Sequence, residues 1–157
     1  MRSARLLVID GRQRLRHIAR DTLPDVLRPG DLVVANDAAT LPASLHGVHA
    51  PSGRPIEIRL AGWTADTSDV ADFAAVVFGA GDFHLRTEDR PLPPPLGAGD
   101  RLELGPLSAT VTSLLGHPRL VSIHFEGSAD AIWAGIARHG KPIQYSHLSE
   151  PLVLWDV

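Results

Sequence analysis

The residues with the clearest chemical potential lie in one string, LRPGDLVVANDAATLPASL at 27–45. Asn36 and Asp37 place an amide beside a carboxylate where an expected strand ends, and ligands often bind outside the ends of strands. Such a pair could contact the polar groups of a small molecule. The same two residues are also typical of a plain turn that ends the strand, so both interpretations stand at this point.

A second feature is the basic start of the chain. Residues 1–20 contain six arginines and one aspartate, whereas the remaining 137 residues hold nine basic and seventeen acidic groups. Arg12, Arg14 and Arg16 alternate, and guanidinium groups match phosphate oxygens with two parallel hydrogen bonds. They are candidates for RNA contacts, although the solvent side of a strand would show the same alternation. The net charge of −3 argues against a chain that binds nucleic acid through its overall field.

The histidines do not predict a metal site. In an extended segment His46 and His49 would point to opposite faces, and the chain has no cysteine to complete a zinc site or to form a disulfide or a catalytic thiol. His124 and Glu126 share a strand face, with His84 expected on a neighbouring strand. An exposed polar face explains that group.

The elements that must position these residues are mainly short strands, because fourteen glycines and thirteen prolines interrupt the chain. Patterns of β-branched and alternating residues predict strands at 5–10, 15–18, 31–36, 43–49, 55–60, 73–78, 83–86, 101–104, 108–115 and 119–125, with 152–155 as a further candidate. A short helix is expected at 23–27 with Thr22 as its cap. A longer helix is expected at 129–139, capped by Ser128, with Ile132, Trp133 and Ile136 on its packed face.

A glycine-aspartate unit recurs in RPGDLVV at 28–34, GAGDFHL at 79–85 and GAGDRLEL at 97–104. It predicts turns in which glycine takes a positive φ and aspartate bonds to nearby backbone amides. Together with the strand count, these turns favour a small closed β-barrel. PLPPPL at 91–96 is expected to be a stiff loop between barrel strands, and its PxxP pattern leaves a polyproline docking motif as an alternative.

The composition is that of an ordinary globular chain, with 157 residues, 44% apolar residues and 21% charged residues. This length suits one domain or two small units. No apolar run approaches the 18 or more residues of a membrane helix, and none follows the basic start as a signal peptide requires. The expectation is a cytoplasmic protein without membrane segments.

Several segments resemble the S-adenosylmethionine:tRNA ribosyltransferase-isomerase family of queuosine biosynthesis. The family pattern SRLLVLD, LRPGDLLVxNDTRVIPARLxG and GGKVEVLLL is matched in order and spacing by ARLLVID at 4–10, LRPGDLVVANDAATLPASLHG at 27–47 and SGRPIEIRL at 52–60. GHPRLVSIHF at 116–125 and EPLVLWDV at 150–157 resemble later family segments. The resemblance spans nearly the whole chain, and its 27–47 part is the most specific.

The chain also departs from that family pattern. Ala38 and Ala39 replace Thr-Arg, Ser44 replaces an arginine, Ala4 replaces a serine, and GKPIQY at 140–145 replaces PLPPY. Family members are about twice this length and continue into a C-terminal half with further motifs. The matching residues are Arg5, Gly30, Asp31, Asn36, Asp37, Pro42, Glu57 and Tyr145.

The resemblance implies a fold and a set of sites. The expected fold is mainly β (α+β), a small β-barrel at 46–145 inserted into a partial α/β domain at 1–45 and 146–157, with two short helices. Asn36, Asp37, Arg5 and Tyr145 become candidates for substrate binding, whereas the catalytic residues are unassigned. S-adenosylmethionine is the implied co-substrate, with no metal.

The implied activity is transfer of the ribosyl group of S-adenosylmethionine to a 7-deazaguanine base in tRNA, with release of adenine and methionine. The chain alone is expected to be inactive, because the acid or base of the reaction is expected beyond residue 157. Two alternatives are a non-catalytic RNA- or partner-binding barrel module and a homologue recruited to another S-adenosylmethionine or nucleoside reaction. Exposed apolar surface on a partial α/β domain would favour pairing with a second chain or with another copy.

Overall fold

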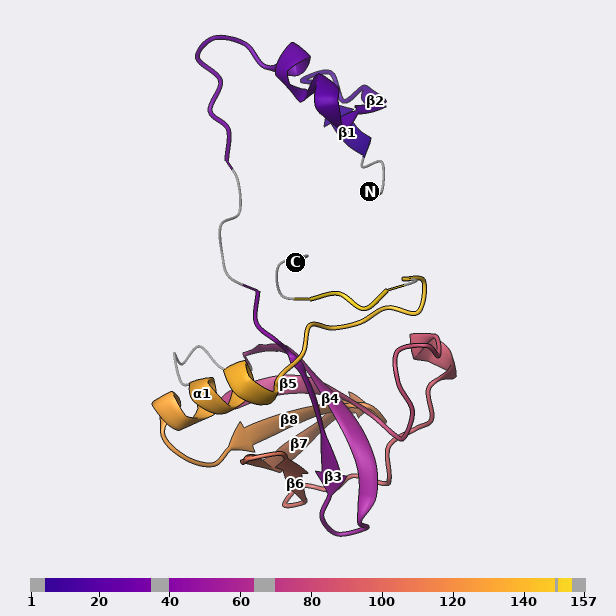
Figure 1. Ribbon diagram of the computed structural model, residues 1–157, viewed down its shortest axis with the longest axis vertical. Helices are drawn as coiled ribbons and strands as arrows, with labels where there is room; N and C mark the ends of the chain where they lie inside the picture. The colour runs from indigo at the N-terminus through magenta and orange to yellow at the C-terminus, as the bar shows by residue number, and fades with distance from the viewer. Residues whose placement is uncertain (1–4, 35–39, 64–69, 149, 154–157) are drawn as a thin grey trace. The chain divides into compact units, whose positions relative to one another are not determined.

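The computed structural model describes residues 5–34, 40–63, 70–148 and 150–153 (Figure 1). Residues 1–38 and 39–157 form two compact units, and each is described by itself. The proposed division into a barrel at 46–145 and an α/β domain at 1–45 and 146–157 stays a prediction.

The N-terminal unit is an antiparallel hairpin followed by a short helix. Strand β1 (Arg5–Ile9) pairs with β2 (Leu15–Ala19), and the 3-10 helix η1 (Arg20–Val26) follows directly. The Asp10 carboxylate fixes the turn by accepting hydrogen bonds from the backbone N–H groups of Arg12 and Arg14, at 2.9 and 3.0 Å. These bonds to the charged carboxylate lower the pKa of Asp10, the Arg14 N–H contributing most.

The second unit is built around a closed six-stranded antiparallel barrel in the order β3-β4-β5-β8-β7-β6. Its strands are β3 (Ser44–His49), β4 (Arg54–Trp63), β5 (Asp72–Phe78), β6 (Arg101–Leu104), β7 (Leu107–His117) and β8 (Leu120–Phe125). The barrel closes where Val48 and His49 of β3 pair with Glu103 and Leu102 of β6. A short 3-10 helix, η2 (Thr87–Asp89), lies in the long connection from β5 to β6.

Strand alternation fills the barrel with apolar side chains. The core residues include Leu45, Ile58, Val77 and Ile123, each at most 1% exposed. Because successive side chains on a strand point to opposite faces, the residues between them lie on the outer face of the barrel.

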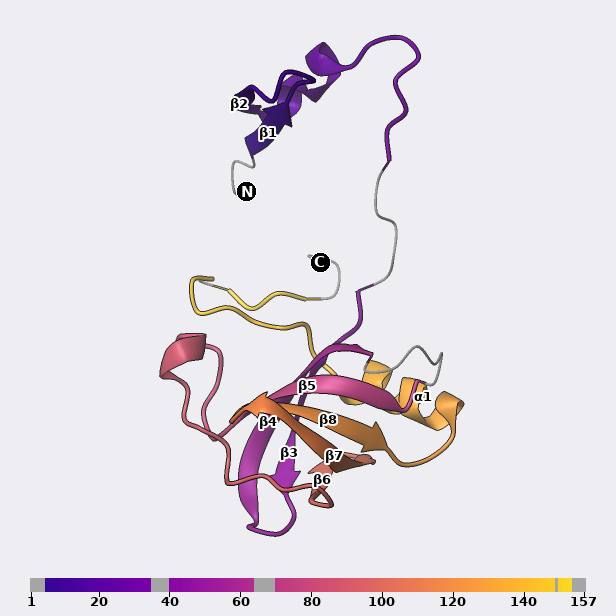
Figure 2. The same cartoon turned by 180° about the vertical axis from the view of Figure 1, so that it is seen from behind.

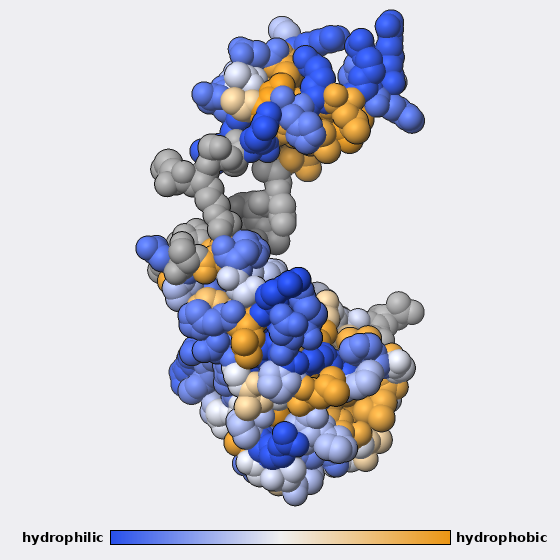
Figure 3. Space-filling view, turned by 90° about the vertical axis from the view of Figure 1, so that its right-hand side faces the viewer, coloured by the Kyte–Doolittle hydropathy of each residue, from blue (hydrophilic) through white to orange (hydrophobic). Residues whose placement is uncertain are grey.

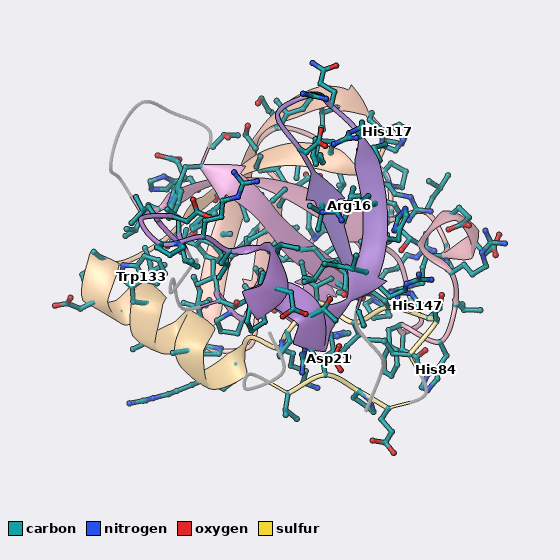
Figure 4. All side chains as sticks on the ribbon, turned by 90° about the horizontal axis from the view of Figure 1, so that it is seen from above. Arg16, Asp21, His84, His117, Trp133 and His147 are labelled. Carbon is teal, nitrogen blue, oxygen red and sulfur yellow. The ribbon has the colours of Figure 1, made fainter. Side chains whose placement is uncertain are left out.

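Helix α1 (Ala129–His139) packs against the barrel, as the sequence predicts, and Ser128 accepts a capping hydrogen bond from the N–H of Ala131 at 3.3 Å. Ile132 and Ile136 are buried and belong to the same core as the strands. Trp133 differs from the prediction because it is 38% exposed (Figure 4). It follows Ile132 by one residue, which turns its side chain by about 100° around the helix.

Four predicted elements differ in the structure. Residues 31–34 form no strand, since no described strand pairs with them, and Leu32 and Val34 are 87% and 85% exposed; residues 35–36 of the predicted strand lie outside the described residues. The strand predicted at 83–86 is wrong, because these residues form a turn before η2. The helix predicted at 23–27 is the 3-10 helix Arg20–Val26, and Thr22 donates to the carbonyl of Ala19 instead of capping it. Residues 152–153 are not in a strand, and 154–155 lie outside the described residues.

The glycine-aspartate units confirm their predicted geometry. Gly30, Gly81 and Gly99 have φ of +92°, +111° and +94°. Each following aspartate accepts a backbone N–H, Asp31 from Arg28, Asp82 from His84 and Asp100 from Gly97. The turns therefore follow from local chemistry alone.

The fold class is as expected, a mainly β chain with a small closed barrel and short helices. No helix in the described part of the chain is long and apolar enough to cross a membrane.

Candidate functional site

The candidate site lies on the outer face of β3 and β4. Ser44 and His46 of β3 stand opposite Arg59 and Glu57 of β4 in the antiparallel register. Ile56 and Ile58 face the core, so Glu57 between them faces outward. Glu57 is nevertheless only 4% exposed, because the connection after β5 and the segment after α1 lie over this part of the barrel (Figure 2).

Glu57 is the centre of a buried hydrogen-bonded network. Its Oε1 accepts the hydroxyl of Ser44 at 2.9 Å and Nε of Arg59 at 2.7 Å, and its Oε2 accepts Nη1 of Arg90 at 2.7 Å. Burial alone would raise the pKa of Glu57, but the hydrogen bonds from Arg59, Arg90 and Ser44 outweigh it and lower that pKa below its usual range. Glu57 is therefore a carboxylate at neutral pH.

Arg90 joins the loop after η2 to this carboxylate. Its Nη2 also donates to the carbonyls of Gly79 and Gly81, at 3.3 and 3.0 Å. Its Nε is buried and has no hydrogen-bond partner among the described residues. Arg90 thus fixes the loop but retains one unsatisfied donor, a costly state for a buried polar group.

The outer face carries a cluster of three arginines around one aromatic ring. The guanidinium carbons of Arg59, Arg90 and Arg119 lie 4.7, 5.0 and 5.1 Å from the centre of the Phe78 ring. Arg119 donates to the carbonyls of Arg90 and Pro91. Burial, and then the charge of Arg90, lower the pKa of Arg119. Positive charge therefore exceeds negative charge behind Glu57.

A pocket of about 510 Å³ opens over this face. Its polar side is formed by Ser44, His46, Glu57, Asp82, Lys141 and Gln144, and its apolar side by Phe83, Pro142, Pro151, Leu152 and Val153. Burial lowers the pKa of His46 against the opposing effect of Glu57, and Lys141 lowers it further. The imidazole in this pocket is therefore neutral at neutral pH.

Hydrogen bonds hold the segment after α1 along one wall of the pocket. The N–H groups of Ser44 and Lys141 donate to each other's carbonyls at 3.0 and 2.9 Å, which joins the chain after α1 to β3. Gln144 then binds Leu152 twice, its Nε2 donating to the Leu152 carbonyl at 2.8 Å and its Oε1 accepting the Leu152 N–H at 2.7 Å. These two hydrogen bonds hold residues 151–153 beside the pocket, which they help to line. Figure 4 labels His84 in the connection from β5 to β6 and His147 in the segment after α1, and residues of both segments line the pocket.

Of the sequence-predicted substrate residues, the structure describes Arg5 and Tyr145. Asn36 and Asp37 lie outside the described residues. Arg5 is exposed in β1, opposite Ala19. Tyr145 is 47% exposed, contacts the ring of His147 and lines a separate apolar pocket of about 360 Å³ beside Trp63. The structure therefore leaves these four assignments as predictions.

The three predicted RNA contacts are exposed on the N-terminal unit. Arg14 is paired with Asp10, its Nη2 lying 2.7 Å from Oδ2. Arg12 lies in the turn and Arg16 in β2, where it lines a shallow pocket of about 1020 Å³ together with Asp25 and Arg28 (Figure 4). They do not form one strand side, because only Arg16 belongs to a strand.

Other histidines have structural partners. His49 is 3% exposed, and its ring nitrogens lie 2.8 Å from Ser52 Oγ and 3.0 Å from Asp100 Oδ2, which joins the β3–β4 turn to the start of β6. His124 pairs with Asp72 and His84 with Asp82. Within the described ranges no three His, Cys, Asp or Glu side chains gather in a way that could bind a metal ion.

Sequence reasoning missed most of the site's residues, among them His46, Arg59, Arg90 and Lys141. Arg90 lies 33 residues from Glu57 in a loop with no motif, and His46 was considered only as a metal ligand. The one available signal was Glu57, which the family pattern shares. A glutamate that lies between two core isoleucines on a barrel strand needs a cationic partner if other segments of the chain bury it.

The second unit is thus a small closed β-barrel with a buried Glu-Arg network and an outer pocket. Comparison with known proteins gives the family of the chain. The family described as "Queuosine biosynthesis protein" matches residues 1–149. The S-adenosylmethionine:tRNA ribosyltransferase-isomerase of Phenylobacterium zucineum is 33% identical over 149 residues, covering 88% of this chain and 37% of that protein. The protein of the same name from Thermosynechococcus vestitus is 30% identical over 151 residues, covering 90% of this chain and 38% of its own length.

A shorter match is closer in sequence. The protein of the same name from Synechococcus elongatus is 46% identical over 57 residues, which are 36% of this chain and 16% of the relative. The chain belongs to the queuosine biosynthesis protein family. It spans less than two fifths of the length of the curated relatives it matches.

Proposed function

We propose that this chain is the N-terminal part of a divergent S-adenosylmethionine:tRNA ribosyltransferase-isomerase-like protein. The reaction would transfer the ribosyl group of S-adenosylmethionine to a 7-deazaguanine base in tRNA, with release of adenine and methionine. The observation that carries the proposal is the family match over residues 1–149. It is supported by Glu57, a residue of the family pattern and the only buried carboxylate among the described residues, which lies at the floor of the outer pocket.

The chain would contribute binding surfaces and not the whole catalytic centre. Glu57 already accepts hydrogen bonds from Ser44, Arg59 and Arg90, so it is poorly suited to accept a proton from a substrate. Asn36, Asp37, Arg5 and Tyr145 are proposed to contact the small substrate, and Arg12, Arg14 and Arg16 the tRNA backbone. The acid and base of the reaction are proposed to be supplied by a part that corresponds to the rest of its relatives' length, or by a partner chain.

The test is adenine release by this chain from S-adenosylmethionine, with and without a tRNA that carries the 7-deazaguanine base. The expected result is no release by the 157-residue chain and release by a two-component mixture that adds the remaining part of a relative. Turnover by the chain alone would overturn the proposed division of roles. No turnover by any such mixture would count against the ribosyltransferase function itself.

A non-catalytic RNA-binding module is a second candidate, favoured by the exposed Arg12, Arg14 and Arg16 on the N-terminal unit. Its test is titration of labelled tRNA at increasing salt, because phosphate contacts give an affinity that falls steeply with salt. Replacing all three arginines with glutamine should reduce the salt dependence. Replacing Arg54, Arg101 and Arg138, which are exposed on the other unit, is the matched control.

A third candidate is recruitment to another reaction of S-adenosylmethionine or of a nucleoside, favoured by the replacement of two family arginines by Ala39 and Ser44. A thermal-shift screen with S-adenosylmethionine, adenine and nucleosides separates it from the first. A ligand present at 100 times its dissociation constant stabilises the folded state by about 2.7 kcal/mol.

A further inference from the structure

The turn between β3 and β4 belongs to a hydrogen-bonded series of a serine, a histidine and an aspartate. Oγ of Ser52 lies 2.8 Å from Nδ1 of His49, and Nε2 of the same ring lies 3.0 Å from Oδ2 of Asp100. Asp100 is 51 residues from His49 in the sequence, so the closure of the barrel brings the three together. The turn lies at the end of the barrel away from the segment after α1 (Figure 1), and other residues line the outer pocket.

Asp100 decides which ring nitrogen of His49 carries the proton. Hydrogen bonds from the N–H of Gly97 and from His49 lower the pKa of Asp100, so at neutral pH it is a carboxylate that can only accept. In the neutral imidazole the single proton is therefore on Nε2, and Nδ1 presents its lone pair. The hydroxyl of Ser52 is the donor that remains, and it donates to Nδ1. The two ring nitrogens are exchanged relative to the triad of serine hydrolases, in which Nε2 faces the serine.

The exposure of the three residues differs in the way that a nucleophile requires. His49 is 3% exposed and the Asp100 side chain 24%, so the ring is held between fixed partners. Ser52 is exposed. Gly53 follows with a φ of +65° and has no side chain that could cover the hydroxyl. A serine with a base behind its oxygen and solvent in front of it is suited to react as a nucleophile.

The backbone around Ser52 limits the reaction. The N–H groups of Ser52 and Gly53 donate to the carbonyl of His49, at 3.2 and 2.9 Å, so they are engaged and do not stabilise an oxyanion. The N–H of Arg54 lies 3.4 Å from Oγ of Ser52, which is a weak contact. Loss of one oxyanion donor typically slows acyl transfer by about 10²–10³. We therefore expect Ser52 to react with activated acyl donors and to release the acyl group slowly.

We propose that Ser52 is an acyl-accepting nucleophile for activated esters, with His49 as its general base and Asp100 as the residue that positions the ring. Oγ of Ser52 forms a bond to the carbonyl carbon of the ester while its proton passes to Nδ1 of His49. The bond from that carbon to the leaving oxygen then breaks, and the leaving oxygen takes the proton from His49. Ester and serine thus give acyl-serine and alcohol, and no oxidant or further reactant is needed. The inference goes beyond the proposed function and does not depend on it.

The test is labelling of the whole chain with p-nitrophenyl acetate and with an alkyl fluorophosphonate, followed by peptide mapping by mass spectrometry. Both probes are expected to modify Ser52, and the acetate should give a burst of p-nitrophenolate followed by slow turnover. Ser113, an exposed serine of β7, is the internal control. Ser52 should be labelled at least about a hundredfold faster than Ser113, because general base catalysis contributes a factor of that order or more.

Three variants separate the roles of the residues. Ser52→Ala should abolish the burst, and Ser113→Ala should leave it unchanged. His49→Asn keeps a polar atom near the place of Nδ1 but has no basic nitrogen, so it should slow the labelling of Ser52 by about 10²–10⁴.

The positioning role of Asp100 has a spectroscopic readout that does not depend on stability. Nitrogen NMR of the His49 ring should show the proton on Nε2 in the unchanged chain. In Asp100→Asn it should show both tautomers, because the carboxylate that selects one of them is gone. The labelling of Ser52 should slow in the same variant.

The proposal is overturned if neither probe labels Ser52, if Ser113 is labelled as fast, or if Ser52→Ala retains the burst. Labelling of a folded His49→Asn protein at the unchanged rate would also overturn it. Circular dichroism establishes the fold of each variant, and Ser52→Ala is expected to fold because Ser52 is exposed. These assays contain neither S-adenosylmethionine nor tRNA, so their outcome is independent of the adenine-release test of the proposed function.

Discussion

Glu57 and its cationic partners destabilise the folded chain unless all of them are present. Taking a carboxylate and two guanidinium groups out of water costs several kcal/mol per ion. Their mutual hydrogen bonds offset this cost only when every partner is in place. Ser44, Arg59 and Arg90 supply that geometry at 2.7–2.9 Å. The network therefore specifies where the loop after β5 lies more than it adds net stability.

Glu57→Gln should destabilise the chain by about 3–5 kcal/mol at pH 7, because it leaves two buried guanidinium groups without their carboxylate. The pKa of Glu57 is lowered in the folded state, so its contribution is complete above its unfolded pKa of about 4.3 and is lost as the pH falls through the folded pKa. The difference in free energy of unfolding between the unchanged chain and Glu57→Gln should therefore narrow below about pH 4. Urea unfolding at a series of pH values measures it.

The matched control is Glu103→Gln, at an exposed position of β6. It should change stability by less than about 0.5 kcal/mol at every pH. Equal losses for the two variants would contradict a special role for the Glu57 network.

The sequence predicted some of these residues and could not predict others. Glu57 was visible as a family residue, and Asp31, Asp82 and Asp100 were predicted to bind backbone amides, because turn chemistry is local. Arg90 was not predicted, since the contact that defines its role spans 33 residues. Long-range pairing of this kind has no periodic signature.

At the level of elements, barrel closure depends on a close approach between β3 and β6. A Cβ on Gly47 would overlap the backbone oxygen of Glu103, so no residue with a side chain fits there. Only glycine allows the two strands to pair at Val48 and His49.

Gly47→Ala should therefore destabilise the barrel by at least about 2 kcal/mol, since the clash is with backbone that cannot move aside cheaply. Gly62→Ala on β4 is the control, because a Cβ there meets nothing within 4 Å and its φ is not positive. Thermal unfolding of both variants measures the difference. A Gly47→Ala protein as stable as Gly62→Ala would show that the closure is adaptable.

Strands with partners were predicted well, and segments without partners were not. Residues 101–104 were assigned correctly because they lie between turns in a complete ladder. Residues 31–34 have the composition of a strand, yet no described segment pairs with them. Residues 83–86 alternate in polarity, but Asp82 binds His84 and fixes a turn instead. Propensity alone decides neither case.

At the scale of the whole molecule, apolar residues on the surface of the N-terminal unit are the main unexplained feature (Figure 3). Leu7, Ile9 and Leu15 share one face of the hairpin and are 54%, 62% and 63% exposed. Contiguous exposed apolar surface of this kind marks an interaction site in most proteins.

The chain is therefore expected to self-associate in the absence of another partner. Sedimentation velocity should show a concentration-dependent shift above the monomer. Replacing these three residues with threonine should restore a monomer without loss of the barrel's stability. The matched control replaces Leu92 and Leu114, which are exposed on the other unit, with threonine as well. It should leave the self-association unchanged. A monomer at all concentrations would contradict this prediction.

The most direct test of the account is an equilibrium titration of the chain with S-adenosylmethionine, with adenine quantified in the same samples. Saturable binding that is not followed by adenine release is the predicted result, because the proposed function assigns binding surfaces to this chain and the acid and base of the reaction to another part of the protein or to a partner chain. Adenine release by the chain alone, or the absence of any saturable binding, would contradict it.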